Sequence, residues 1–128
     1  MFANIEIISN NTYNFSTFTY KIPKKFIGKV YKGTVVEIKF RNRKLLGIIL
    51  NIKDETNIKK LNTIEKVILN FDNLQFNYLK YVASVNRINI GILIYNLFEI
   101  NSYKLQHKTV NKSLTNLTFN QINEINFN

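Results

Sequence analysis

The residues best suited to chemistry in this sequence are cations that could bind phosphate groups. Nine of them fall within residues 21–44 against the single acid Glu37: Lys21, Lys24, Lys25, Lys29, Lys32, Lys39, Arg41, Arg43 and Lys44. The whole chain of 128 residues carries a formal charge of +10. A cluster of this density predicts a polyanionic partner, most often nucleic acid and less often a membrane surface or an RNA-rich assembly. The alternative is a solvated, lysine-rich face that reflects A+T-rich coding DNA.

A β-hairpin over residues 35–52 is predicted to position the last of these cations. Apolar residues alternate with polar ones on both sides of the basic tip 41–44, which is the period of a strand. They are Val36, Ile38 and Phe40 in the first run, and Leu46, Ile48, Leu50 and Ile52 on one face of the second. Leu45 and Ile49 make the second run apolar on its other face, which is typical of a central strand. Gly47 predicts a bulge or a close backbone approach.

Other short strands and then helices are predicted around this hairpin. Alternation indicates strands over residues 3–7 and 18–22, the second ended by Pro23, and a fifth short strand at residues 64–68. Asp72 and Gln75 form a capping-box pattern before a helix that reaches Val85. Residues 90–98 could be a second helix or a buried strand. We expect a mainly β domain with C-terminal helices (α+β) over residues 1–100, a small OB-like β-barrel of about five strands followed by one or two helices, and a polar linker from residue 101 to residue 128.

The composition argues against several classes of function. The chain contains no Cys, which removes disulfides, thiolate zinc sites and cysteine nucleophiles. No apolar run approaches the roughly 18 residues of a membrane span and no secretory signal is recognisable, so we expect a cytoplasmic protein without a membrane partner. His107 is the single His and has no obvious catalytic partner, and adjacent Asp54 and Glu55 are typical of a solvated loop. We predict no catalytic residue, no metal and no cofactor.

An ordered set of motifs over residues 3–98 resembles one known family. Phe18, Tyr20 and Pro23 form F-x-Y-x-x-P, the apolar hairpin strand follows, and residues 43–49 read R-K-x-x-G-I-I. A strand over residues 61–67, a helix containing Ala83, and Gly91 eight residues later continue the order. The set resembles the N-terminal 3′ DNA-binding domain of primosomal protein N′, the replication-restart helicase PriA. The resemblance implies an OB-like module that binds the 3′ end of the leading strand at a stalled replication fork.

The resemblance also implies roles for individual residues. In such a site an aromatic pair frames the terminal base, an acceptor takes the 3′-hydroxyl, and cations hold the phosphates. Phe18 and Tyr20 match the aromatic pair, although alternation could instead send both rings into the core. Thr19 stands where the family has an acceptor Asp, Arg41 where it has Gly, and Asn62 where it has Lys; Val85-Asn86 replace a usual Tyr-Tyr pair. These departures leave general affinity for nucleic acid in place and 3′-end specificity open.

We therefore predict a non-catalytic module that binds forked DNA or single-stranded DNA with a 3′ end, with replication-restart proteins as further partners. The predicted contact residues are Phe18, Thr19, Tyr20, Lys24, Lys25, Lys39, Arg41, Arg43, Lys44 and Asn62. No phosphate-binding-loop motif occurs, so ATP hydrolysis of the family's helicase type is not expected, and residues 117–121 faintly resemble the opening of a helicase region that this sequence lacks. The alternatives are a protein-interaction module or decayed fragment, which would expose an apolar patch clear of the cations, and an RNA-binding basic barrel.

Overall fold

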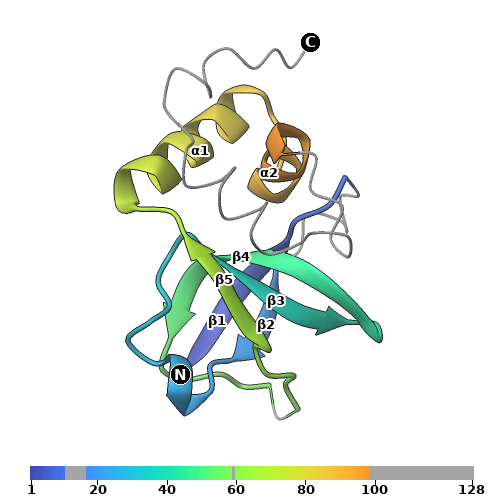
Figure 1. The fold of residues 1–128 in the computed structure, drawn as a ribbon, viewed down its shortest axis with the longest axis vertical. Coiled ribbons are helices and arrows are strands. Elements are labelled where there is room, and N and C mark those ends of the chain that lie inside the picture. The colour runs from blue at the N-terminus through green and yellow to red at the C-terminus, as the bar shows by residue number, and fades with distance from the viewer. Residues whose placement is uncertain (11–16, 59, 99–128) are drawn as a thin grey trace.

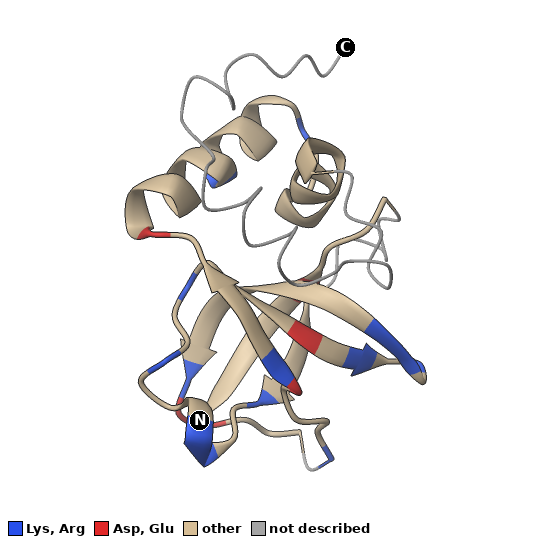
Figure 2. Cartoon of the chain, in the orientation of Figure 1, with Lys and Arg blue, Asp and Glu red and all other residues tan. Residues whose placement is uncertain are grey.

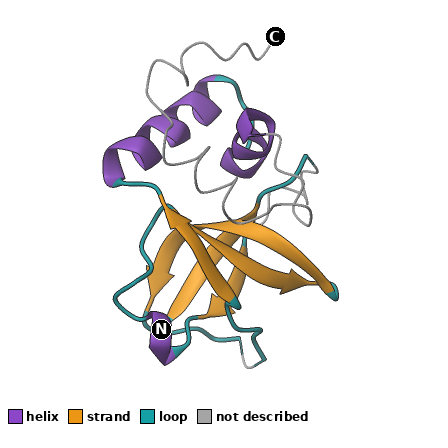
Figure 3. Ribbon diagram, in the orientation of Figure 1, coloured by secondary structure: helices purple, strands orange, loops and turns teal. Residues whose placement is uncertain are grey.

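Alternating apolar residues build a five-stranded antiparallel sheet, and two helices cover one end of it (Figure 1, Figure 3). The computed structural model describes residues 1–10, 17–58 and 60–98. The strands are β1 (Phe2–Ile7), β2 (Phe18–Lys21), β3 (Thr34–Phe40), β4 (Arg43–Lys53) and β5 (Lys66–Asn70), and the helices are α1 (Asn73–Val85) and α2 (Ile90–Phe98). The prediction of a mainly β domain followed by helices is confirmed. The predicted linker and helicase-like opening at 101–128 lie outside the described residues.

The predicted barrel is not closed. The strand order is β2-β1-β4-β3-β5, which leaves β2 and β5 as the two edges of the sheet. An isolated parallel bridge, between Lys21 and Thr63, links the β2 edge to the segment that leads into β5. Pro23 follows almost at once and has no N–H to donate, so a longer ladder cannot form on this side. The fifth strand accordingly begins at Lys66, and Ile64 is buried just before it.

The β3–β4 hairpin is confirmed, with a tighter turn than the predicted four-residue tip. Phe40 pairs with Arg43, so the turn consists of two residues, Arg41 and Asn42. Their φ angles are 50° and 63°, which is the type I′ geometry that fits the twist of a hairpin. Arg43 and Lys44 therefore belong to β4, and Lys44 lies directly opposite Lys39 on β3.

Strand β4 is apolar on both faces because it divides the core in two. Leu46 and Ile48 pack under the helices, whereas Ile49 packs into the concave side of the sheet. The prediction that Ile52 shares a face with Leu46 and Ile48 is wrong. Asn51 pairs with Asn4 and Ile49 with Ile5, so Leu50 is an extra residue in the ladder and turns Ile52 towards the concave side.

Two glycines allow the backbone to approach closely. A Cβ on Gly47 would lie 2.3 Å from Ile5 Cγ2, which confirms the close approach predicted there. A Cβ on Gly91 would lie 2.2 Å from the carbonyl oxygen of Ile7, so α2 can pack directly on β1. The backbone N–H of Gly91 also donates to the Glu6 carboxylate, which caps the start of α2.

Both helices are defined by local signals and tertiary packing. Asp72 accepts from the backbone N–H of Gln75 at 2.7 Å, and the Gln75 side chain accepts from the N–H of Asp72 at 3.1 Å, as the capping-box pattern predicts. The segment 90–98, which periodicity left undecided, is helix α2. Neither helix is long and apolar enough to cross a membrane.

Candidate nucleic-acid interface

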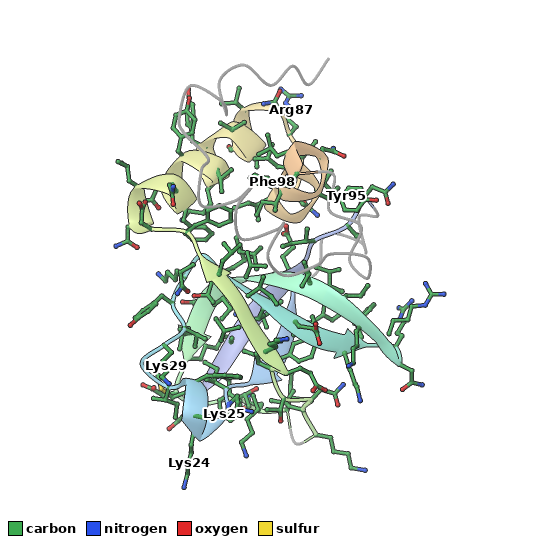
Figure 4. All side chains as sticks on the ribbon, in the orientation of Figure 1. Lys24, Lys25, Lys29, Arg87, Tyr95 and Phe98 are labelled. Atoms are coloured by element: carbon green, nitrogen blue, oxygen red, sulfur yellow. The ribbon has the colours of Figure 1, made fainter. Side chains whose placement is uncertain are left out.

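The segment after β2 and the segment before β5 lie side by side and position a first group of cations, which are Lys24, Lys25 and Lys29. The backbone N–H of Lys21 donates to the carbonyl of Asn62 at 2.9 Å, and that of Ile64 donates to the carbonyl of Lys21 at 3.0 Å. Pro23 then ends the extended chain, and Lys24–Phe26 form a 3₁₀ turn. Figure 4 shows Lys24, Lys25 and Lys29 at one end of the molecule. The helices, with Arg87, Tyr95 and Phe98, lie at the other end.

These two segments enclose a polar cleft of about 480 Å³. Its lining includes Pro23, Lys25, Lys39, Asn62, Thr63 and Glu65. Three of the predicted contact residues, Lys25, Lys39 and Asn62, thus come together from three separate parts of the chain. Two cations and an amide that line one open cleft form a suitable site for a phosphate and the nucleotide attached to it.

A carboxylate also faces this polar cleft. Lys39 Nζ lies 3.9 Å from Glu65 Oε1, while the two side chains remain 56% and 40% exposed. Such a long, solvated ion pair contributes little to stability. The Lys39 and Glu65 side chains can therefore leave this ion pair and bind a ligand instead.

A second cleft, of about 460 Å³, lies beside the polar cleft and shares Pro23 and Thr63 with it. We call it the apolar cleft, because Met1, Ile22, Pro23 and Ile27 line it together with Lys21, Lys24 and Thr63. The predicted contact residue Lys24 lies here, next to its sequence neighbour Lys25 but in a different cleft.

The predicted aromatic pair on β2 divides between the core and the surface. Tyr20 is 4% exposed, and its hydroxyl donates to the carbonyl of Lys39 at 2.6 Å; burial raises the pKa of this hydroxyl. Phe18 is half-buried, with its ring centroid 4.6 Å from that of Phe40. Tyr20 is thus placed to fix the backbone of Lys39, and Phe18 keeps some ring surface accessible.

Thr19 is not gathered with its neighbours Phe18 and Tyr20. Alternation along β2 turns it to the other face of the sheet, where it pairs with Asn4. Its hydroxyl donates to Asn4 Oδ1 at 3.1 Å. The three residues 18–20 therefore do not line one common pocket.

The hairpin tip carries the second group of cations. Arg41, Arg43 and Lys44 are exposed, and the guanidinium carbon of Arg41 lies 5.0 Å from the Phe40 ring centroid. Figure 2 shows basic residues along the projecting end of the hairpin and, separately, around the end of the sheet that is remote from the helices. Because Lys39 lines the polar cleft and also faces Lys44, it joins the two groups into one basic track.

The sequence did not indicate two of the residues that line the polar cleft. Glu65 and Thr63 lie in a polar stretch with no motif of their own, and they reach the site through the isolated bridge between Lys21 and Thr63. That bridge joins residues far apart in the chain, so periodicity could not reveal it. Within the described residues, no group of three His, Cys, Asp or Glu side chains could hold a metal ion.

An exposed apolar stripe follows one face of α1, away from both clefts. Leu74, Tyr81 and Val85 are 66%, 64% and 60% exposed. Figure 2 shows that α1 carries few charged residues. This is the kind of surface that distinguishes a protein-interaction module from a purely DNA-binding one.

The comparison with protein families places much of the chain in one family. The model of the PriA 3′DNA-binding domain (3′BD) matches residues 7–94, from the end of β1 to α2. The matched range includes the hairpin, the polar cleft and the 3₁₀ turn. No curated protein matches the chain.

Proposed function

Because this chain belongs to the PriA 3′DNA-binding-domain family, we propose that it binds the end of a DNA strand in the polar cleft and the adjoining phosphates along the basic track. The observation that carries the proposal is the convergence of Lys25, Lys39 and Asn62 on one cleft of about 480 Å³. In this arrangement the two lysines neutralise backbone phosphates, and the amide of Asn62 hydrogen-bonds to the sugar or base.

Recognition of a free 3′-hydroxyl requires an acceptor, and Glu65 supplies it in this proposal. The Thr19 hydroxyl is bonded to Asn4 on the other face of β2. Glu65 instead lines the cleft beside Lys39. A hydroxyl that donates to a carboxylate makes a charge-assisted hydrogen bond, roughly twice as strong as a neutral one. A phosphate in place of the hydroxyl would be repelled by the same carboxylate.

The double variant K25A/K39A tests whether DNA occupies this cleft. We expect it to weaken binding of single-stranded DNA and to lower the salt dependence by about 0.7 logarithmic units for each phosphate that the protein no longer neutralises. The control variant K32A/K53A removes the same charge from two exposed lysines that line neither cleft. Fluorescence anisotropy over a range of salt concentrations measures both. Equal salt slopes for the two variants would contradict the proposal, and tighter binding of RNA of the same sequence would favour the RNA-binding alternative.

The biological role that follows is recognition of stalled replication forks for replication restart in a bacterial cytoplasm, with restart proteins as partners. Support comes from the family match and from the absence of a phosphate-binding-loop motif in the sequence, which favours a binding module over a motor. We expect no DNA-stimulated ATP hydrolysis and no strand separation by the purified chain. Either activity would contradict this role.

A second candidate function, a protein-interaction module, is favoured by the stripe of Leu74, Tyr81 and Val85 on α1. The partner proposed for this interaction module is the helicase region that accompanies this type of domain in PriA. L74K/Y81K places charges on exposed positions, so the fold and DNA binding should be retained. Loss of binding to a PriA helicase region without its own 3′DNA-binding domain would support this function, and unchanged binding would refute it.

A further inference from the structure

The apolar cleft combines buried and exposed apolar residues with cations. Ile22 is buried, Pro23 is half-buried, and Ile27 has 46% of its surface exposed. Lys21 and Lys24 line it as well, and no acidic residue is among the described residues that do so. It is therefore an apolar surface flanked by two cations, unlike the polar cleft with its carboxylate.

The 3₁₀ turn explains why neighbouring lysines face different clefts. Side chains three residues apart eclipse in a 3₁₀ turn, and the N–H of Ile27 donates to the carbonyl of Lys24 at 3.2 Å. Lys24 and Ile27 therefore line the same cleft, while Lys25 lines the other. Pro23 and Thr63 form the partition between the two clefts.

A ligand that fits this arrangement has a flat apolar part, an anionic group beside it, and a continuation into the polar cleft. A nucleotide within a DNA strand has all three. We propose, resting on the proposed function, that the apolar cleft binds the nucleotide next to the terminal one, with its base against Ile27 and Pro23. The phosphate between the two nucleotides then lies within reach of Lys24 and Lys25, one from each cleft.

If the base of the second nucleotide contacts the Ile27 side chain, removing either one should weaken DNA binding by the same factor. The probe is a short 5′-labelled single-stranded DNA with its second nucleotide from the 3′ end either intact or abasic. We expect the wild type to bind the abasic strand about fivefold more weakly, as expected for the loss of a small buried apolar surface. Ile27→Ala should lose about the same factor on intact DNA and nothing further on the abasic strand.

Ile58→Ala is the matched control, since Ile58 is 51% exposed and lines neither cleft. It should bind both strands as the wild type does. Moving the abasic position to the middle of the strand should abolish the wild-type loss. Equal binding of intact and abasic strands by the wild type, or equal behaviour of I27A and I58A, would overturn the inference while K25A/K39A still tests the proposed function. Failure of the wild type to bind any of these strands would overturn the proposed function itself, and the inference with it.

Discussion

At the residue scale, the polar cleft combines two lysines with one carboxylate, and this mixture suits a nucleotide that has both an anionic phosphate and a hydroxyl donor. The backbone of Lys39 is fixed by a hydrogen bond, because the buried Tyr20 hydroxyl donates to its carbonyl. Glu65 balances its charge at 3.9 Å. The proposed selectivity for a free 3′-hydroxyl depends on this carboxylate.

Glu65→Gln should therefore reduce end discrimination more than it reduces affinity. The amide keeps an acceptor but loses the charge, so binding of 3′-phosphorylated single strands should rise and the preference for a free hydroxyl should fall to about one fifth or less. Anisotropy titrations with the two strand types measure this ratio.

The matched control for this variant is Glu55→Gln, which removes the same charge from an exposed position outside both clefts. It should raise affinity for both strand types by similar small factors and keep the ratio. If E65Q and E55Q give the same ratio, Glu65 does not read the 3′ end.

Glu6 makes a pH-dependent contribution to stability. Burial raises the pKa of this carboxyl, and the hydrogen bond from Gly91 only partly opposes the rise. A raised folded-state pKa means that the stabilising contribution is complete below the ordinary value of 4.5 and is lost as pH rises through the folded pKa.

Glu6→Gln should flatten this pH dependence, because an amide can still accept from the Gly91 N–H and does not titrate. The urea midpoints of the two proteins should approach each other in acid, and the variant should be the more stable at neutral pH. Parallel midpoint curves for wild type and variant would contradict this assignment.

Residue identities alone predicted only part of the site. The cations were recognisable because phosphate binding depends on charge, which the sequence displays directly. Alternation along the predicted strand already places Thr19 on the face opposite to Phe18 and Tyr20, so its separation from them was predictable. The position of Glu65 beside Lys39 depends on pairing between distant segments, which no local pattern predicts.

At the element scale, α1 ends in a Schellman-type arrangement with an unusual residue. The N–H of Ile88 donates to the carbonyl of Ala83 at 3.0 Å, and that of Arg87 to Ser84 at 3.1 Å. Arg87 has φ of 56°, in the left-handed region that glycine usually occupies at this position.

Arg87→Gly should therefore be more stable than Arg87→Ala by about 1 kcal/mol. Both variants remove the guanidinium, but only glycine relieves the left-handed strain of about 1–2 kcal/mol, and its greater backbone entropy in the unfolded state offsets part of that gain. Thermal or urea unfolding measures the difference. Equal stability of the two variants would show that the strain is negligible.

The hairpin tip gives a separate prediction about the basic track. R41A/R43A/K44A should weaken binding of forked DNA and reduce its salt dependence by about 0.9 logarithmic units for each duplex phosphate that the tip neutralises in the wild type. The triple variant K32A/K53A/K80A changes the charge equally at exposed positions that line neither cleft and should retain the wild-type slope. An unchanged slope for the tip variant would show that the tip does not contact DNA.

Elements with a clear period were predictable, and irregular ones were not. The hairpin and the capping box follow from alternation and from the Asp72–Gln75 pair. The extra residue Leu50 has no sequence signature, and it reverses the orientation of Ile52. Segment 90–98 is apolar at almost every position, so its helical period does not stand out in the sequence.

At the scale of the whole molecule, the helices and the surface proposed to bind DNA occupy opposite ends. Figure 2 shows most of the basic residues on the sheet and its loops, while the apolar stripe lies on α1. A domain built in this way can contact DNA with one end and another protein with the other. Both clefts lie where the segment that follows β2 meets the segment that precedes β5, and the number of predicted strands did not indicate them.

The central claim, that this domain binds a DNA end in the polar cleft, is tested most directly with two forks. They differ only in a free or phosphorylated leading-strand 3′ end, and fluorescence anisotropy measures the affinity of the wild type and of K25A/K39A. We predict tighter, salt-sensitive binding of the fork with the free hydroxyl, and markedly weaker binding of that fork by the variant. Equal affinity of the wild type for both forks would contradict end recognition, and unchanged affinity of K25A/K39A for the fork with the free hydroxyl would show that the end is bound elsewhere.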